Sequence, residues 1–402
     1  MTKELIDLIA QPIVQEYIRL HEHDDFQKLL LKQRVMFGIP TAMIAQQMAG
    51  RKKSQHKLPH WYNTRGIAFP PSVNVEQCSS EATGQMKLRL LRSLFKEPPV
   101  VADLTGGFGV DTFHLSLYAS KVQYVEPDLE LLEIVRHNHR LLGISNVIYH
   151  NLSAESFLST NEIPDFLFVD PSRRIGARKV FKLADCEPDI TELQSKYFKQ
   201  ARHILIKTSP LLDIKQGYTQ IENVKSVHIV AVDNECRELL FHIQPGFSGE
   251  PLIQAVDLDR ASGTLSECSF TMSEESKTVA NFSTPQSFLF EPNVAILKGG
   301  AFKWISKKFG ISKLAPNTHL YTSNQIVENF PGRIFKKLRE LKLDKNLIQY
   351  FPKGYANILT RNYPLTVDEI KKKTGLKEGG ELYLICTQSE KQKFVMVMER
   401  IK

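Results

Sequence analysis

The stretch with the most evident chemistry is VVADLTGGFGVDTFHLSL, residues 100–117, where an apolar run ends in an acid and glycines follow at once. The acid and the glycines are Asp103, Gly106, Gly107 and Gly109. Glycines after a strand let the backbone approach a ligand closely where the next helix begins. A dinucleotide fingerprint would need a further glycine at position 112, where Thr112 stands. The pattern predicts a ligand-binding turn of another kind, or otherwise a plain tight strand–helix turn.

The acid at the strand end indicates which ligand the turn would hold. A carboxylate beside a pyrophosphate is unfavourable, whereas a carboxylate beside a cation is favourable. The methionine part of S-adenosylmethionine carries an ammonium and a sulfonium. Asp103, Thr105, Gly107 and Gly109 are therefore predicted to bind that cofactor.

Two later strand ends supply further candidate cofactor contacts. Glu126 ends the second strand, where an acid can accept both ribose hydroxyls, although a surface acid capping a turn would look the same. Ser153 and Ala154 follow the third strand, where the adenine edge would rest. The acid that is usual at position 153 is absent, so this signal is weak.

The fourth strand ends in DPSRR, residues 170–174, which bears most directly on the reaction type. Asp170 would face the ligand crevice, contact the cofactor and accept a hydrogen bond from an exocyclic amine. Pro171 would stiffen the loop, and Arg173 or Arg174 would stack on a base or bind a phosphate. The alternative is that Asp170 caps a helix and the arginines are solvated.

These motifs resemble those of class I S-adenosylmethionine-dependent methyltransferases. DPSRR is similar to the DPPY, DPPF and DPPR loops of nucleic-acid base methyltransferases, and EQCSSEATGQM resembles a segment that packs over the cofactor in RNA guanine-N2 methyltransferases. Together with FEPNVAILKGGAFK, HLYTS and the basic tail, DPSRR resembles a bacterial group of predicted RNA methylases. That group carries a ferredoxin-like insert and a THUMP-like C-terminal domain. The resemblance implies an S-adenosylmethionine-dependent enzyme acting on RNA.

Two departures from the related motifs narrow the chemistry. Amine methyltransferases usually have an aromatic residue where this chain has Arg173, and Ser172 replaces their second proline. Uracil-C5 methyltransferases use DPxR but need a nucleophilic cysteine after strand five, where this chain has Thr208 and Ser209. Methylation of a base nitrogen is therefore favoured over covalent addition to a pyrimidine ring.

Short β-branched runs alternate with helical stretches from about residue 98 onward. The runs begin at Val100, Lys121, Asn146, Asp165, His203, Ser226 and Glu238. The first five are far enough apart for crossover helices, which predicts a parallel sheet. The last two are joined only by NECR and its flanking residues, so they must form an antiparallel hairpin. We therefore expect the seven-stranded, Rossmann-like α/β sheet of a class I methyltransferase, a strand arrangement that is unusual for nicotinamide-binding proteins.

Changes in rhythm and composition divide the 402 residues into four expected domains. Residues 1–75 would form a helical domain and residues 76–246 the methyltransferase domain. Residues 247–330 would form a ferredoxin-like α+β domain, and residues 331–402 a basic THUMP-like domain. The last segment contains 16 Lys and Arg against 8 Asp and Glu, so it holds the whole net charge of +8.

This charge distribution predicts a polyanion-binding module attached to a neutral body. The lysines expected to contact phosphates are Lys336, Lys337, Lys371 and Lys372. A solvated basic surface that binds nothing specific is the alternative reading. Structured RNA, held through its phosphates and shape, is the predicted partner.

Other features exclude several function classes. Five scattered cysteines without a CxxC pair indicate neither a zinc site nor a disulfide framework, and they fit a reducing cytoplasm. No apolar run is long enough to span a membrane. His137 and His139 are expected to be surface residues rather than metal ligands, and Trp61 a packing residue. A methyltransferase of DNA, protein or a small molecule stays possible, as does a non-catalytic RNA-binding protein with this fold.

Overall fold

The computed structural model describes residues 1–26, 29, 33–160, 162–173 and 183–402. The chain divides into two compact units. The first unit comprises Met1–Val227 and Arg237–Gly249, and the second comprises His228–Cys236 and Glu250–Lys402. Within the described part of the chain, no helix combines the length and the apolar character needed to cross a membrane.

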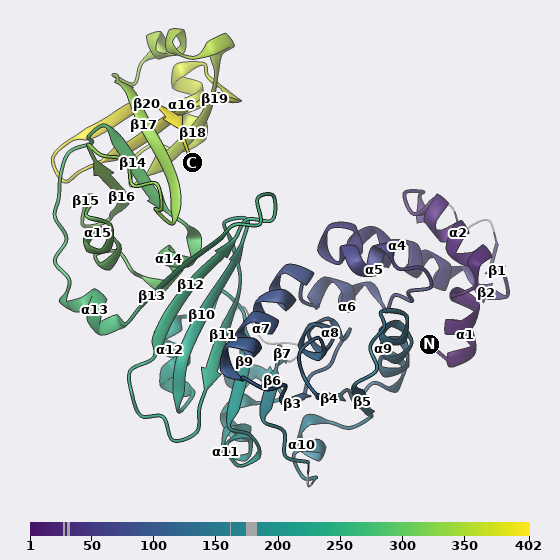
Figure 1. Cartoon of the computed structure of the whole chain (residues 1–402). Helices are drawn as coiled ribbons and strands as arrows, with labels where there is room; N and C mark the ends of the chain where they lie inside the picture. Colours follow the sequence, from purple (N-terminus) through teal and green to yellow (C-terminus); the bar gives the residue numbers. More distant parts are fainter. Residues whose placement is uncertain (27–28, 30–32, 161, 174–182) are drawn as a thin grey trace. The chain divides into compact units, whose positions relative to one another are not determined.

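The first unit is built on a sheet that contains five neighbouring parallel strands, in the order β5-β4-β3-β6-β9 (Figure 1). These strands are β3 (Val100–Asp103), β4 (Lys121–Val125), β5 (Val147–His150), β6 (Phe166–Val169) and β9 (His203–Thr208). β6, with the sequence FLFV, is an unbroken apolar run and fully buried, as expected of a strand that is covered on both faces. The predicted Rossmann-like α/β fold is confirmed.

Antiparallel pairing ends the parallel part of the sheet. β11 (Glu235–Ile243) runs antiparallel to β9, and β10 (Val224–Val232) lies next to β11. Only Asp233 and Asn234 connect β10 to β11, and their φ angles of 53° and 59° are those of a tight hairpin turn.

Five of the six helices around this sheet begin at a polar residue that caps them. The helices are α7 (Glu81–Leu94), α8 (Val110–Ser116), α9 (Leu129–Leu141), α10 (Ala154–Phe157), α11 (Ile190–Gln200) and α12 (Ile214–Gln220). The side chains of Ser80, Asp128 and Asp189 accept hydrogen bonds from the first backbone N–H groups of α7, α9 and α11. Such caps stabilise a helix by about 1 kcal/mol each. Helix α8 instead begins at Gly109, in the left-handed conformation.

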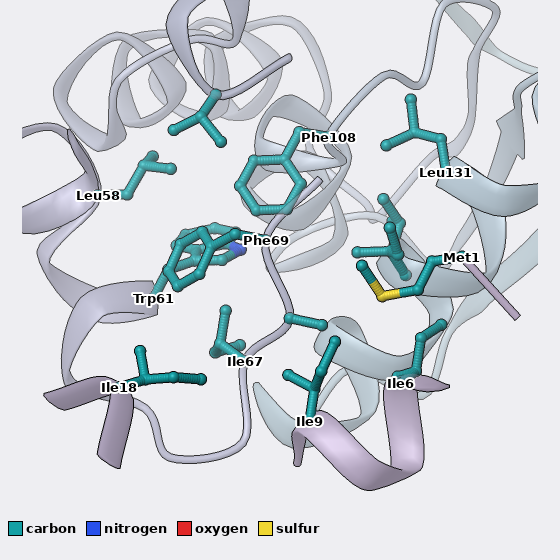
Figure 2. Packing of buried hydrophobic residues seen from close by; sticks show 14 of the residues in the cluster. Met1, Ile6, Ile9, Ile18, Leu58, Trp61, Ile67, Phe69, Phe108 and Leu131 are labelled. Atoms are coloured by element: carbon teal, nitrogen blue, oxygen red, sulfur yellow. The ribbon is translucent and has the colours of Figure 1, made fainter. Parts of the chain in front are cut away.

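The N-terminal segment is helical apart from a short strand pair. Its elements are α1 (Lys3–Ile9), α2 (Pro12–His21), β1 (Val35–Met36), β2 (Ile39–Pro40), α4 (Thr41–Lys57), α5 (Pro59–Asn63) and α6 (Ser72–Gln77). Figure 2 shows Trp61 and Phe69 from this segment packed in one cluster with Phe108 and Leu131 of the sheet region. Trp61 is fully buried, as a packing residue should be. The N-terminal helices therefore share one hydrophobic core with the sheet.

This shared core overturns the expectation that His137 and His139 lie on the surface. Both are buried, because α9 packs on the sheet and also contacts the N-terminal segment. His137 Nε2 contacts the carbonyl oxygen of Gly66 at 2.9 Å, and His139 Nε2 contacts that of Gly109 at 2.9 Å. His137 thus holds the loop at Gly66, and His139 holds the glycine turn at Gly109.

The second unit contains a seven-stranded sheet in the order β15-β16-β14-β17-β20-β19-β18. Its strands are β14 (Phe288–Pro292), β15 (Ser312–Ala315), β16 (Thr318–Ser323), β17 (Gly332–Glu340), β18 (Tyr355–Arg361), β19 (Lys377–Gln388) and β20 (Lys393–Arg400). The pairing of β14 with β17 carries this sheet across residues 330 and 331, where we expected a domain boundary.

Shorter elements complete the two units. The second unit also contains the antiparallel pair β12 (Leu252–Leu258) and β13 (Leu265–Phe270), helices α13 (Met272–Lys277), α14 (Val294–Gly299), α15 (Trp304–Phe309) and α16 (Val367–Thr374), and the 3-10 turns η2 (Lys345–Tyr350) and η3 (Pro352–Gly354). The first unit adds β7 (Ser172–Arg173), β8 (Cys186–Glu187) and the 3-10 turn η1 (Leu183–Asp185).

Candidate active site

The glycine turn between β3 and α8 is held tightly against the sheet. The Gly106 N–H donates to the carbonyl oxygen of Val125 at 2.9 Å, and a Cβ at Gly106 would lie 2.3 Å from the Tyr124 ring. Gly109 has a φ of +73°, and a Cβ there would lie 2.5 Å from Val135. A Cβ at Gly107 would meet only the Thr105 carbonyl oxygen, at 3.7 Å. Gly106 and Gly109 therefore serve packing, and Gly107 is the glycine whose side-chain position is unobstructed.

Asp103 organises this turn from below. Its Oδ1 accepts a hydrogen bond from the Thr105 N–H at 3.1 Å, and its Oδ2 accepts one from the Thr112 hydroxyl at 2.6 Å. Burial raises the pKa of Asp103 to about 7. Thr112, which stands where a dinucleotide-binding motif would have its third glycine, is thus a hydrogen-bond partner of Asp103.

Glu126 meets the same turn from the neighbouring strand. Its Oε2 accepts a hydrogen bond from the Gly107 N–H at 3.0 Å, and its Oε1 accepts one from the Asp128 N–H at 2.9 Å. Burial raises the pKa of its carboxyl group. Carboxylate and glycine backbone therefore lie together, in the arrangement that a ribose beside an amino-acid moiety would require.

Sequence reasoning missed His139 as a support for the turn. Burial lowers the pKa of His139 to about 4, so the ring is neutral. Its Nε2 faces the carbonyl oxygen of Gly109 and must carry the proton, which leaves Nδ1 to accept from the Tyr149 hydroxyl at 3.1 Å.

The two residues predicted beside the adenine edge lie at the start of α10. Ser153 caps α10 by accepting a hydrogen bond from the Ser156 N–H, and Ala154 is buried.

Asp170 lies directly beside the glycine turn. Its backbone N–H donates to the Thr105 hydroxyl oxygen at 2.6 Å, because β3 and β6 are parallel neighbours whose carboxyl ends meet at one edge. Its side chain is 30% exposed, so the carboxylate is accessible to a substrate. Thr105 thus links the two motifs that the sequence singled out.

Lys207 is the charged partner of Asp170, and sequence reasoning did not identify it. It lies near the end of β9, and its Nζ contacts Oδ2 of Asp170 at 2.5 Å. Burial alone would lower the pKa of Lys207, but the carboxylates of Asp170, Asp111 and Glu238 outweigh burial and raise it. Lys207 is therefore an ammonium ion at the predicted active site.

A buried charge network lies next to this pair. Lys87 of α7 is fully buried and contacts Asp111 of α8 at 2.9 Å and Glu238 of β11 at 2.8 Å. Ser79 donates to Asp111 at 2.7 Å and accepts from Lys87 at 3.1 Å. Burial would raise the pKa of Asp111, but Lys87 and Lys207 outweigh it and lower the pKa. The network ties the QCSS segment to the helix that follows the glycine turn.

The remaining predicted residues of the DPSRR motif are only partly described. Pro171 is half-buried, and Ser172 and Arg173 form β7, which pairs with β8. The structure describes the backbone of Arg173 but not its side chain. Arg174 lies outside the described residues. No cluster of three or more His, Cys, Asp and Glu side chains suited to a metal ion occurs among the residues that are described.

The four predicted phosphate contacts lie in the second unit and differ in their surroundings. Lys336 and Lys372 are exposed. Lys337 donates to the Pro285 carbonyl oxygen at 2.7 Å, and Lys371 pairs with Glu378 at 2.7 Å. Lys336 and Lys372 are therefore the two that are better placed to meet a phosphate.

Comparisons with known proteins agree with this architecture. One family profile, described as a ferredoxin-like domain, matches residues 288–331, and another, described as THUMP domain-like, matches residues 332–400. The structure is similar to the crystal structure of a proposed methyltransferase from Porphyromonas gingivalis W83, with a TM-score of 0.87 and 28% sequence identity, covering 100% of both chains.

Relatives found by sequence point the same way. Two uncharacterized S-adenosylmethionine-dependent methyltransferases of Mycobacterium tuberculosis, from strains H37Rv and CDC 1551, are each 20% identical to this chain over 294 residues. The match spans 72% of this chain and 77% of each relative. The predicted family resemblance, enzyme class and cofactor are confirmed by these comparisons.

Proposed function

We propose that this chain, an S-adenosylmethionine-dependent methyltransferase with ferredoxin-like and THUMP-like segments, methylates a base nitrogen of RNA. One observation carries the proposed chemistry. Asp170 holds an accessible carboxylate beside the glycine turn, joined to it by the hydrogen bond from the Asp170 N–H to Thr105. An amine that donates to this carboxylate would lie next to a cofactor bound at the turn.

The residues of the turn suit the cofactor. Asp103 would compensate its positive charge, Glu126 would accept its ribose hydroxyls, and Gly107 has no side chain that would obstruct it. The bound cofactor supplies an electrophilic methyl group. What the protein adds is orientation, since Asp170 would hold the acceptor nitrogen with its lone pair toward that methyl group. The nitrogen would then lose a proton toward the carboxylate.

Neither the end of β9 nor Cys78 offers a thiol suited to covalent attack on a pyrimidine. Thr208 is buried beside Lys207, at the strand end where such enzymes carry their nucleophilic cysteine. Cys78 interacts electrostatically with Lys207 and Asp111, but burial raises its pKa to about 11. A thiol that is neutral at physiological pH is a weak nucleophile. These observations favour a base nitrogen over a pyrimidine carbon as the acceptor.

The second unit supports RNA as the substrate. It contains the THUMP-like segment and the basic residues 331–402, in which Lys and Arg outnumber Asp and Glu by 16 to 8. Besides Lys336 and Lys372, it exposes Tyr350, with the Arg339 guanidinium 5.1 Å from the ring centroid. Basic groups beside exposed aromatic rings are typical of surfaces that bind single-stranded RNA.

The test is a transfer assay with methyl-labelled S-adenosylmethionine and RNA from cells that lack this protein, with DNA and protein pools alongside. We expect label in RNA alone, and digestion to nucleosides would identify the methylated atom. Asp170→Ala should reduce transfer by about two to three orders of magnitude, as expected for a lost active-site hydrogen bond.

Cofactor binding of the Asp170→Ala protein, measured by calorimetry, is the matched control. It should stay within about threefold of the original value, because the contacts of Asp103 and Glu126 are untouched. Equal loss of binding and transfer would mean that Asp170 serves the cofactor instead. Label in DNA or protein would refute the RNA assignment, and no label in any pool despite cofactor binding would refute macromolecular methylation.

A further inference from the structure

The pairing of Lys207 with Asp170 follows from the register of the sheet. β6 and β9 are parallel neighbours in which Val169 lies opposite Ile206, so the next residue of each strand end lies side by side. Their side chains meet at 2.5 Å, and the lysine side chain is only 13% exposed. An ammonium that is largely withdrawn from water thus contacts the one carboxylate that the proposed function places on the acceptor.

Lys207 interacts with several acids at once, and the neighbouring ammonium of Lys87 is already engaged. Lys87 is already shared between Asp111 and Glu238. Lys207 interacts with both of these acids as well as with Asp170, and Asp103 also acts on Asp170. The titratable groups that surround the pair are Asp103, Asp111, Glu238, Lys57, Lys87 and Cys78.

We propose that Lys207 is a positioning residue that compensates the charge of Asp170 and fixes the direction of its carboxylate toward the methyl acceptor. The proposal rests on the proposed role of Asp170. Without Lys207, Lys87 would still contact Asp111 and Glu238, whereas Asp170 would lose the ammonium that contacts it. We then expect one of the three carboxylates to take up a proton at a higher pH. Asp170 loses its direct partner, so it is the expected site of that proton.

The ionisation state decides whether Asp170 can act. A carboxylate accepts hydrogen bonds only, whereas a protonated carboxyl group also donates and no longer accepts the acceptor's proton. Lys207 contacts Oδ2 of Asp170, so Oδ1 is the oxygen that would meet an amine.

The test follows the ionisation of Asp170 directly and needs no substrate. The full-length protein is labelled with carboxyl-¹³C aspartate, the Asp170 signal is assigned from Asp170→Asn, and its shift is followed with pH. In Lys207→Met the titration midpoint should rise by about one to three pH units, the usual effect of one adjacent opposite charge. Lys207→Arg, which keeps the charge, should titrate near the original midpoint.

An unchanged midpoint in Lys207→Met would overturn the proposal, and so would a Lys207→Arg midpoint as high as that of Lys207→Met. If Lys207→Met does not fold, Lys207→Gln takes its place, because it keeps a hydrogen-bond donor without the charge. Should transfer to RNA be detected, the acid limb of its kcat profile should move with the midpoint while KM changes less. Absence of transfer in the original protein would contradict the proposed function alone, since the NMR midpoint is read independently.

Discussion

The buried ion cluster around Lys87 gives a sharp prediction about stability. Lys87 is fully buried between Asp111 and Glu238, so Lys87→Met leaves two buried carboxylates without their shared cation. Breaking a buried pair by removing one partner costs about 3–5 kcal/mol. Lys207 reaches the same acids and compensates part of the charge, so we expect a loss near the lower end, about 3 kcal/mol.

The assay can be confined to the first unit because the chain has two tryptophans, one in each unit. In a Trp304→Phe background, denaturant unfolding is followed by the fluorescence of Trp61, whose ring lies 4.7 Å from that of Phe113 on the same helix as Asp111. Lys196→Met, at an exposed position of α11, is the matched control and should change stability by less than about 0.5 kcal/mol.

A second change separates lost charge from lost packing. Lys87→Met combined with Glu238→Gln removes one cation and one anion, so it should recover part of the stability that Lys87→Met loses. A loss below about 1 kcal/mol in Lys87→Met, or no recovery in the double variant, would refute the view that charge compensation holds this part of the core together.

Two further predictions concern the glycine turn. Gly109→Ala should weaken S-adenosylmethionine binding at least tenfold, measured by calorimetry, because its Cβ would lie 2.5 Å from Val135 at a φ of +73°, and overpacking alone costs about 1–3 kcal/mol. Binding to the original protein should tighten between pH 6 and pH 8: the pKa of Asp103 is raised to about 7, so the ionised form that a cation prefers predominates only above that pH. Asp103→Asn should remove this pH dependence, and an unchanged dependence would mean that another group is responsible.

The sheet and its motifs were accessible from the sequence because they are local signals. All seven β-branched runs are strands, since an apolar run between polar turns reports burial on both faces. Asp103, Glu126 and Asp170 were found because they end strands of one parallel sheet, and topology then brings strand ends to one edge. Their mutual contacts through Thr105 and Gly107 follow from the strand order β4-β3-β6.

Lys207, Lys87 and His139 were missed for a physical reason. Each acts through a partner far away in sequence: Lys207 and Asp170 are 37 residues apart, and Lys87 and Glu238 are 151 residues apart. A lysine on a strand or helix normally indicates solvent, so only the assembled fold reveals it as buried. His137 and His139 were expected on the surface, and that expectation failed because α9 is covered on more than one side.

The two acids at the strand ends differ in what holds them, and this difference argues for separate roles. Asp103 is held by a hydroxyl and a backbone N–H and is 1% exposed, which suits an acid that shapes a turn and responds to the charge of its ligand. Asp170 is held by an ammonium and is 30% exposed, which suits an acid that must stay charged while a substrate reaches it. Asp103→Asn should therefore weaken cofactor binding, whereas Asp170→Asn should weaken methyl transfer. If both variants lost cofactor binding, or both lost only methyl transfer, the two acids would have the same role.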